Sequence, residues 1–291
     1  MPLQFTITKN GSNYSASVDG GAAFFVGKST SYLGLKGLIN LKNSGAIYSP
    51  TAYETQFGFW AYFIAPTAQA ESGGSLTVLN TYDKAKFTFS FMQYAAHVPE
   101  GDFVKFFRKL LALPAATDYF PDLTLSNGRI AKRSGTTLQE LESKTSTQLL
   151  MDYLNPTSAV IEDAEVLNAA KFIHWAVNDA DHRRIQIETA IAHFKSNMAG
   201  SYDKRYKLNG VPDYVCLVIC DIRHQGRAKS DAILAALNTG GDYEKALKNL
   251  LALGADKYKS RIDTLTAEIT RLRASGKLGK RLWNSAAGDF V

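Results

Sequence analysis

The stretch AESGGSLTVLNTYDKAKFTFSFMQYAAH, Ala70–His97, carries the strongest structural signal in the chain. One acid, Glu71, ends an apolar run, and a second acid, Asp83, lies in the segment that follows. Between them, Gly73-Gly74 is typical of a helix end, because glycine readily takes the left-handed conformation that terminates a helix. Beyond the glycines, LTVLNTYD and KFTFSFM alternate in β-branched and aromatic residues, which predicts a short hairpin with Asp83 near its turn.

The residues before this stretch predict strands and then a helix. Residues 3–26 alternate between apolar and polar residues around Asn10-Gly11, a strong hairpin turn signal. Residues 51–71 are apolar and aromatic, and we expect Pro66 to end or kink the helix there and a short second helix to follow.

From Leu138 onward the pattern is mostly helical. We expect helices near residues 138–142, 147–153, 163–178, 181–198, 213–224, 229–237, 243–253 and 256–274. In the last of these, Ile262, Leu265, Ile269 and Leu272 form one apolar stripe that predicts packing onto the rest of the protein. The predicted fold class is therefore α+β, mostly α, with an N-terminal strand region and a small β-hairpin. The expected division is a β-rich segment 1–49 and a main domain 50–291.

Composition bounds the kind of protein. The chain has 291 residues, of which 45% are hydrophobic and 21% charged, and its formal net charge is +6. A basic surface suits an anionic polymer such as nucleic acid, an anionic membrane or a cell wall. Apolar runs such as Val215–Cys220 fall far short of the roughly 20 residues that span a bilayer, so we expect no membrane span. The first residues alternate and lack a basic start, so we expect no cleaved signal peptide.

The cysteines and histidines give no sign of a metal or a cofactor. Cys216 and Cys220 share one face of a predicted helix, where two small buried side chains are expected rather than a disulfide. The histidines are scattered and form no metal-binding motif. We therefore expect no metal and no cofactor.

The two acids suit the hydrolysis of a glycosidic bond. An inverting glycosidase uses a protonated carboxylic acid and an ionised carboxylate, about 6.5–9.5 Å apart, on either side of the bond. Glu71, at a helix end beside apolar residues, is the candidate acid, because such surroundings disfavour the charged form. Asp83, in a polar turn, is the candidate base. A turn aspartate with only local hydrogen bonds is the structural alternative.

These residues resemble a known superfamily. AESGG, a β segment and then FSFMQ are similar to the lysozyme-like superfamily, which includes phage and goose-type lysozymes, lytic transglycosylases and bacterial chitosanases. The resemblance implies a two-lobed lysozyme-like fold, with the hairpin at the cleft and Glu71 as the catalytic acid. It also implies that Thr88, Ser90 and Gln93 lie along the substrate groove, with the polar face of a strand as the structural alternative for Thr88 and Gln93. Tyr82 could stack on a sugar there or pack in the core. Ser90 departs from the pattern, because that strand usually has glycine there.

A second segment, VCLVICDIRHQGR from Val215, looks like the chitosanase helix that ends in Asp, His and Gly. Asp221 and His224 are the matching candidates for substrate binding, although a helix-end pair that joins two helices is the structural alternative. The nearby Arg223, Arg227 and Lys229 are expected to form a solvent-facing basic cluster, and contact of this cluster with an anionic polymer is the functional alternative.

The resemblance implies a muramidase that cleaves β-1,4 bonds between amino sugars of peptidoglycan, with peptidoglycan or a chitosan-type polysaccharide as partner. The alternatives are a chitosanase, which the positive charge argues against, a lytic transglycosylase that needs only Glu71, and a non-catalytic module that binds cell wall or nucleic acid. No nucleic-acid-binding motif is evident, so nucleic acid is not the expected partner. We expect action at the cell wall or periplasm after delivery by lysis, a phage particle or a secretion machine. An immunity or delivery protein is the further partner of that interpretation.

Overall fold

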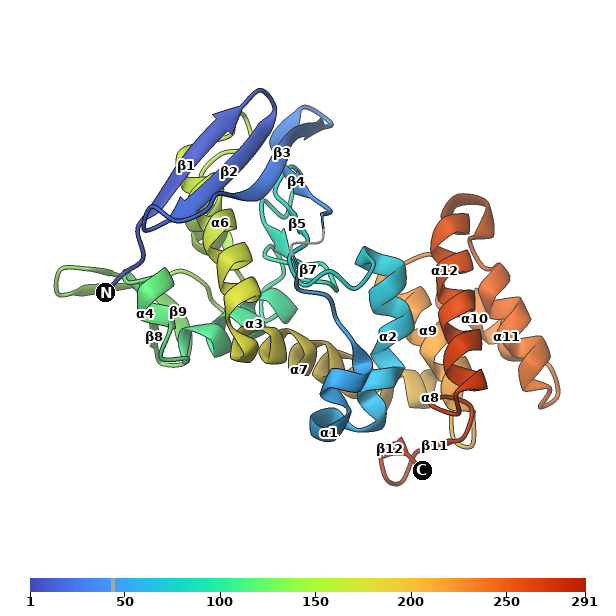
Figure 1. Ribbon diagram of the computed structural model, residues 1–291. Coiled ribbons are helices and arrows are strands. Elements are labelled where there is room, and N and C mark those ends of the chain that lie inside the picture. Colours follow the sequence, from blue (N-terminus) through green and yellow to red (C-terminus); the bar gives the residue numbers. More distant parts are fainter. Residues whose placement is uncertain (43–44) are drawn as a thin grey trace. The chain divides into compact units, whose positions relative to one another are not determined.

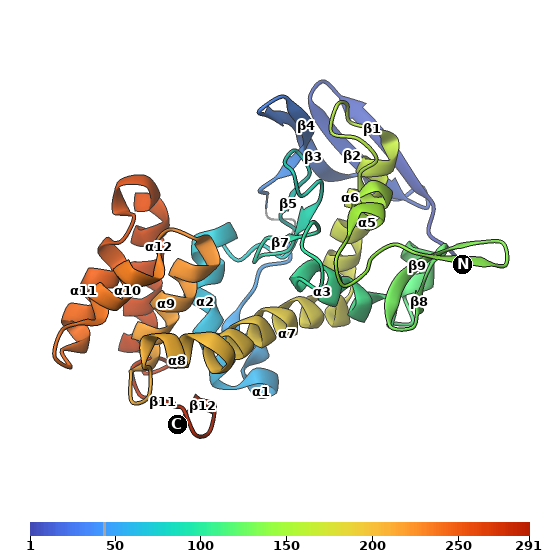
Figure 2. The same ribbon diagram turned by 180° about the vertical axis from the view of Figure 1, so that it is seen from behind.

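The computed structural model describes residues 1–42 and 45–291 (Figure 1; Figure 2). The chain divides into two compact units, each made from two stretches of sequence. The first unit contains residues 1–47 and 75–189, and the second contains residues 48–74 and 190–291. Helix accounts for 47% of the protein and strand for 19%, which confirms the α+β, mostly helical class.

The first unit holds most of the strands. Its strands are β1 (Phe5–Asn10), β2 (Asn13–Val18), β3 (Phe24–Tyr32), β4 (Leu35–Asn40), β5 (Leu79–Asn80), β6 (Thr88–Phe89), β7 (Tyr94–Ala95), β8 (Leu123–Ser126), β9 (Arg129–Ser134) and β10 (Thr137–Glu140). Its helices are α3 (Asp102–Leu111), α4 (Ala116–Tyr119), α5 (Gln148–Leu154) and α6 (Asp163–Asn178). Helix α7 (Ala180–Asn197) begins in this unit and ends in the second.

The structure contains two of the predicted hairpins, β1–β2 and β5–β6. Strands β1 and β2 pair antiparallel around the Asn10-Gly11 turn, as predicted. Strand β5 pairs antiparallel with β6, with Leu79 opposite Phe89, so the predicted hairpin is confirmed and Asp83 lies in its connection. Strand β4 also pairs with β5, so within the described residues β1–β7 form one antiparallel sheet (Figure 1). The expected segment 1–49, of which residues 43 and 44 lie outside the described part, therefore shares its sheet with the hairpin.

An aromatic cluster anchors this hairpin. The ring of Phe172, on α6, lies 5.0–6.2 Å from six other phenylalanine rings. These belong to Phe87, Phe89, Phe103, Phe106, Phe107 and Phe120. Two of them flank Thr88 in the sequence and are fully buried, so burial of their rings fixes the hairpin against α3 and α6.

The second unit is built mainly from helices. Its elements are the 3₁₀ helix η1 (Pro50–Tyr53), α1 (Glu54–Phe57), α2 (Phe59–Ser72), the π-helix η2 (Met198–Tyr202), α8 (Asp203–Tyr206), α9 (Asp213–Gln225), α10 (Ser230–Leu237), α11 (Tyr243–Ala252), α12 (Ala255–Ala274), β11 (Trp283–Asn284) and β12 (Asp289–Phe290). Helix α2 packs against α9 and α12. The predicted apolar stripe of α12 is confirmed, since Ile262, Leu265, Ile269 and Leu272 are all buried.

Two local predictions are wrong. Pro66 neither ends α2 nor starts a second helix, because the helix runs continuously from Phe59 to Ser72. Proline removes one backbone hydrogen bond, and burial of every residue from Trp60 to Ala68 offsets that loss. The helix expected at residues 138–142 is instead strand β10, which pairs with β9 across a turn in which Gly135 has φ 58°.

Both cysteines are buried, as expected for small side chains with a structural role. Cys216 and Cys220 are both buried and unpaired in α9. Burial raises the pKa of both thiols, which makes them unreactive. Among the described residues, no helix has both the length and the apolar character needed to cross a bilayer.

A buried carboxyl group joins α6 to the sheet. Glu165 is fully buried, and its Oε1 accepts hydrogen bonds from the Thr81 hydroxyl and, at 3.2 Å, from the Leu38 backbone N–H. Burial raises the pKa of Glu165 from 4.5 to about 7, although both hydrogen bonds oppose this shift. The folded protein therefore keeps this proton at pH values where the unfolded chain has lost it.

This proton predicts a pH-dependent stability. Because the folded state binds more protons than the unfolded state between about pH 4.5 and pH 7, the free energy of unfolding should fall across that range, by roughly 3 kcal/mol from this one group. Glu165→Gln should remove this slope, as measured by urea denaturation at several pH values. Asp163→Asn, an exposed change on the same helix, should keep it. An unchanged slope in Glu165→Gln would contradict the assignment.

Candidate functional site

Glu71 lies in the last turn of α2. The helix ends because Gly73 takes a left-handed conformation with φ 63°, and its N–H donates to the Gln69 carbonyl at 2.9 Å. The Gly74 N–H donates to the Ala68 carbonyl at 3.1 Å. This predicted cap fixes the backbone directly after Glu71. Its side chain is 19% exposed, so the carboxylate is largely enclosed but still reaches solvent.

One arginine contacts this carboxylate, and an aspartate and a second arginine extend the series of ion pairs. We call Glu71, Asp221, Arg227 and Arg261 the Glu71 cluster. Arg261, on α12, donates from Nη1 to Glu71 and from Nη2 to the Oδ1 of Asp221, at 2.7 Å. Arg227 donates from Nη1 to the other oxygen of Asp221. The cluster therefore joins the end of α2 to α9 and α12 within the second unit.

Charge is balanced within the Glu71 cluster. Asp221 and Arg227 have fully buried side chains, and the Arg261 side chain is 10% exposed. Burial disfavours the charged form of Arg261, but the carboxylates of Asp221 and Glu71 outweigh it and raise the pKa of Arg261. Two guanidinium groups thus face two carboxylates, the arrangement that makes buried charges tolerable. Arg261 is held by Asp221 and in turn fixes the orientation of Glu71.

His224 is the second neighbour of Glu71. Its Nε2 lies 3.9 Å from the Glu71 Oε2, and its side chain is 17% exposed. Burial lowers the pKa of His224, although the Glu71 carboxylate opposes the shift. A neutral imidazole therefore lies beside the carboxylate at neutral pH, at the same partly open surface.

The structure corrects two expectations about this region. Asp221 was expected to contact substrate, but it is fully buried and both of its oxygens are bonded to arginines. It holds Arg261, which in turn contacts Glu71. Arg227 was expected to face solvent, yet it is buried against Asp221.

A second group of predicted residues lines a pocket in the first unit, which we call the hairpin pocket. Its volume is about 440 Å³. Asp83, Thr88 and Gln93 line it. The Asp83 Oδ1 accepts a hydrogen bond of 2.8 Å from the Ala85 N–H, which is the local turn contact expected of an aspartate. Tyr32 and Leu35, from the β3–β4 hairpin, supply an aromatic and an apolar wall.

The hairpin pocket also contains two polar residues that the sequence did not single out for it. The Asn80 Nδ2 donates to the Gln93 Oε1 at 3.1 Å. Among the residues that the structure describes, the Asn80 Oδ1 and the His97 Nδ1 are buried without a hydrogen-bond partner. Buried polar atoms without partners are costly, so both are groups that a polar ligand would satisfy. His97 was expected to be structural.

Tyr82 and Ser90 lie outside the lining of the hairpin pocket. Tyr82 is half-buried, and burial raises the pKa of its hydroxyl. Ser90 is fully buried, so its side chain does not reach the groove surface that the resemblance implies. Its φ is 90°, in the region that favours glycine, which gives a backbone reason why glycine suits this position.

The predicted site residues thus fall into two groups. Glu71, Asp221 and His224 come together in the second unit, and Asp83, Thr88 and Gln93 come together in the first. Within residues 1–42 and 45–291, no cluster of histidine, cysteine, aspartate and glutamate has the arrangement of a metal site. Comparisons with protein-family models, curated proteins and solved structures find no match.

Proposed function

We propose that this protein is a glycoside hydrolase of the lysozyme-like kind that cleaves β-1,4 bonds between the amino sugars of peptidoglycan, with Glu71 as the general acid. The observation that supports the proposal most directly is the exposure and orientation of the Glu71 carboxylate. Its carboxylate is partly exposed at a capped helix end, and a buried arginine–aspartate pair holds it in one orientation. A general acid needs both access to the substrate and a fixed direction.

Arg261 has a defined part in this reaction. Glu71 gives its proton to the glycosidic oxygen as the bond to the sugar carbon breaks, and the group left behind is a carboxylate. Arg261 already donates toward that carboxylate and is itself held by Asp221. Because Glu71 is paired with Arg261 as a carboxylate in the structure, the proposed reaction starts after Glu71 has taken up a proton, and Arg261 then faces the carboxylate that proton transfer restores.

The hairpin pocket, within the first unit, is a second candidate for contact with the polymer. Asn80, Gln93 and His97 offer hydrogen-bonding groups beside the ring of Tyr32, a mixture that suits sugar hydroxyl and acetamido groups. The net charge of +6 favours approach to an anionic cell wall, to which delivery by lysis, a phage particle or a secretion machine would bring the protein.

Product analysis tests this proposal. The purified protein is incubated with peptidoglycan sacculi and, separately, with chitosan, and the products are read by mass spectrometry. Muropeptides with reducing ends are the expected result. Products lighter by one water would indicate a lytic transglycosylase, and fragments from chitosan alone would indicate a chitosanase. No products from either polymer would contradict a glycosidase for amino-sugar polymers and favour a binding module.

A further inference from the structure

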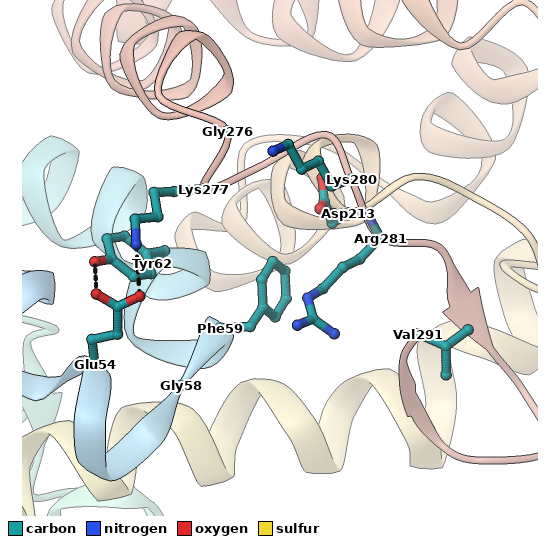
Figure 3. Close-up of a pocket in the computed structure, with 10 residues that line it drawn as sticks. All are labelled: Glu54, Gly58, Phe59, Tyr62, Asp213, Gly276, Lys277, Lys280, Arg281 and Val291. Carbon is teal, nitrogen blue, oxygen red and sulfur yellow. Dashed lines mark hydrogen bonds and ion pairs between the residues drawn. The ribbon is translucent and has the colours of Figure 1, made fainter.

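A second cavity lies wholly within the second unit and contains none of the residues of the Glu71 cluster (Figure 3). We call it the basic pocket, and its volume is about 480 Å³. Phe59, the first residue of α2, lines it, whereas Glu71 is near the last. At a rise of 1.5 Å per residue, the two ends of that helix are about 18 Å apart. The basic pocket is therefore separate from the proposed catalytic acid.

Three cations line the basic pocket, and all come from the segment after α12. They are Lys277, Lys280 and Arg281. Lys277 is already neutralised, because its Nζ lies 2.6 Å from the Glu54 Oε1. The Tyr62 hydroxyl donates to the other oxygen of Glu54, also at 2.6 Å (Figure 3). This hydrogen-bonded group forms one wall of the pocket.

The other acidic residue that lines the basic pocket, Asp213, is hydrogen-bonded to the backbone. Asp213 is fully buried, and its two oxygens accept hydrogen bonds from the N–H groups of Gly279, at 2.7 Å, and Arg281, at 3.2 Å. Asp213 thereby fixes the loop that carries Lys280 and Arg281. Its carboxylate is directed to the backbone N–H groups and not to either cationic side chain.

The positive charges of Lys280 and Arg281 are not neutralised by an ion pair within the described residues. The guanidinium of Arg281 lies 5.1 Å from the centre of the Phe59 ring, beside which it is drawn in Figure 3. Neither Arg281 nor Lys280 forms a side-chain ion pair with any residue in the described part of the chain, and both are exposed. An arginine placed against a ring keeps its N–H edge available for a planar or tetrahedral anion.

We propose that the basic pocket binds a small ligand in which a phosphate or carboxylate group is attached to a ring. The anion would be held by Arg281, with Lys280 adding positive charge at the rim, and the ring would pack against Phe59 (Figure 3). A volume near 480 Å³ is within the range of small-molecule sites and holds a ring with its anionic group. The inference does not depend on the glycosidase activity, since no residue of the Glu71 cluster takes part.

Binding of simple probes to the full-length protein tests the inference. Phenyl phosphate and benzoate combine a ring with an anion, whereas inorganic phosphate lacks the ring and phenol lacks the charge. By isothermal titration calorimetry at low salt, we expect phenyl phosphate or benzoate to bind more tightly than inorganic phosphate, and phenol not to bind. The preferred member of the first pair identifies the anion as phosphate or carboxylate. Equal binding of phenol and phenyl phosphate, or no binding of either anionic ring, would overturn the inference.

Variants locate the site. Arg281→Gln should weaken binding of the preferred probe by tenfold or more, because a hydrogen bond to a charged group contributes about 1.5–3 kcal/mol. Lys280→Gln should weaken it less. Arg133→Gln removes an equal charge from an exposed position on β9 and should leave binding unchanged, as should Glu71→Gln. Thermal unfolding establishes that each variant is folded. Equal weakening in Arg281→Gln and Arg133→Gln would show a general charge effect and contradict the site.

Discussion

Replacing Glu71 by glutamine is expected to lower the rate of glycan cleavage by about a thousandfold, since general acid catalysis contributes roughly 10²–10⁴-fold. Glutamine has nearly the shape of glutamate but carries no transferable proton. Arg261 stays bonded to Asp221 in the variant, so its position should change little. The measurement is the release of reducing ends from sacculi, with the fold checked by circular dichroism.

The matched control for this variant is Glu54, the first residue of α1 in the second unit. Glu54 is also a helix carboxylate paired with a cation, Lys277, but it belongs to the basic pocket. Glu54→Gln should keep the full cleavage rate. If Glu71→Gln retains more than a tenth of the activity, Glu71 is not the acid and the proposed mechanism fails.

Replacing Asp221 by asparagine is expected to destabilise the second unit by about 3–5 kcal/mol, the usual cost of removing one partner from a buried ion pair. Asp221 accepts from both Arg227 and Arg261 and is fully buried. Without its charge, Arg227 would be enclosed with no carboxylate beside it. Urea denaturation followed by tryptophan fluorescence measures the change.

The control is Asp263→Asn, which removes a surface carboxylate on α12 that pairs with Lys259 four residues earlier. Exposed pairs of this kind contribute less than about 1 kcal/mol, so this variant should be nearly as stable as the original protein. Comparable losses of unfolding free energy in both variants would show that burial does not make Asp221 more important for stability than a surface carboxylate.

The sequence predicted elements well where local pattern and packing agree. Helix α6 was predicted at 163–178 and is observed at Asp163–Asn178, because its apolar periodicity and its acidic first turn indicate the same structure. The helix predicted around Leu138 was wrong because these residues favour a helix locally, whereas pairing with β9 holds them in a strand. The helix end predicted at Pro66 was wrong for a similar reason, since burial around α2 outweighs one lost hydrogen bond.

The candidate site was predicted in part. Glu71, Asp221 and His224 were chosen from two short segments, and the structure brings them together. Arg261 was missed because it lies 40 residues beyond Asp221, on a helix whose visible signal is its apolar stripe. Asn80 was missed because a single asparagine in a strand has no pattern, and its unpartnered oxygen is evident only once the hairpin is folded.

The path of the chain has a consequence for synthesis on the ribosome. Residues 48–74 leave the first unit, form α2 and return, but the partners of α2 in the second unit are made much later. The end of α2 at Ser72 and the end of α12 at Ala274 are 202 residues apart. At 5–20 residues per second, the nascent helix waits about 10–40 s for its partners. During that time Trp60–Ala68, buried in the finished protein, is an uncovered apolar segment that chaperones would recognise.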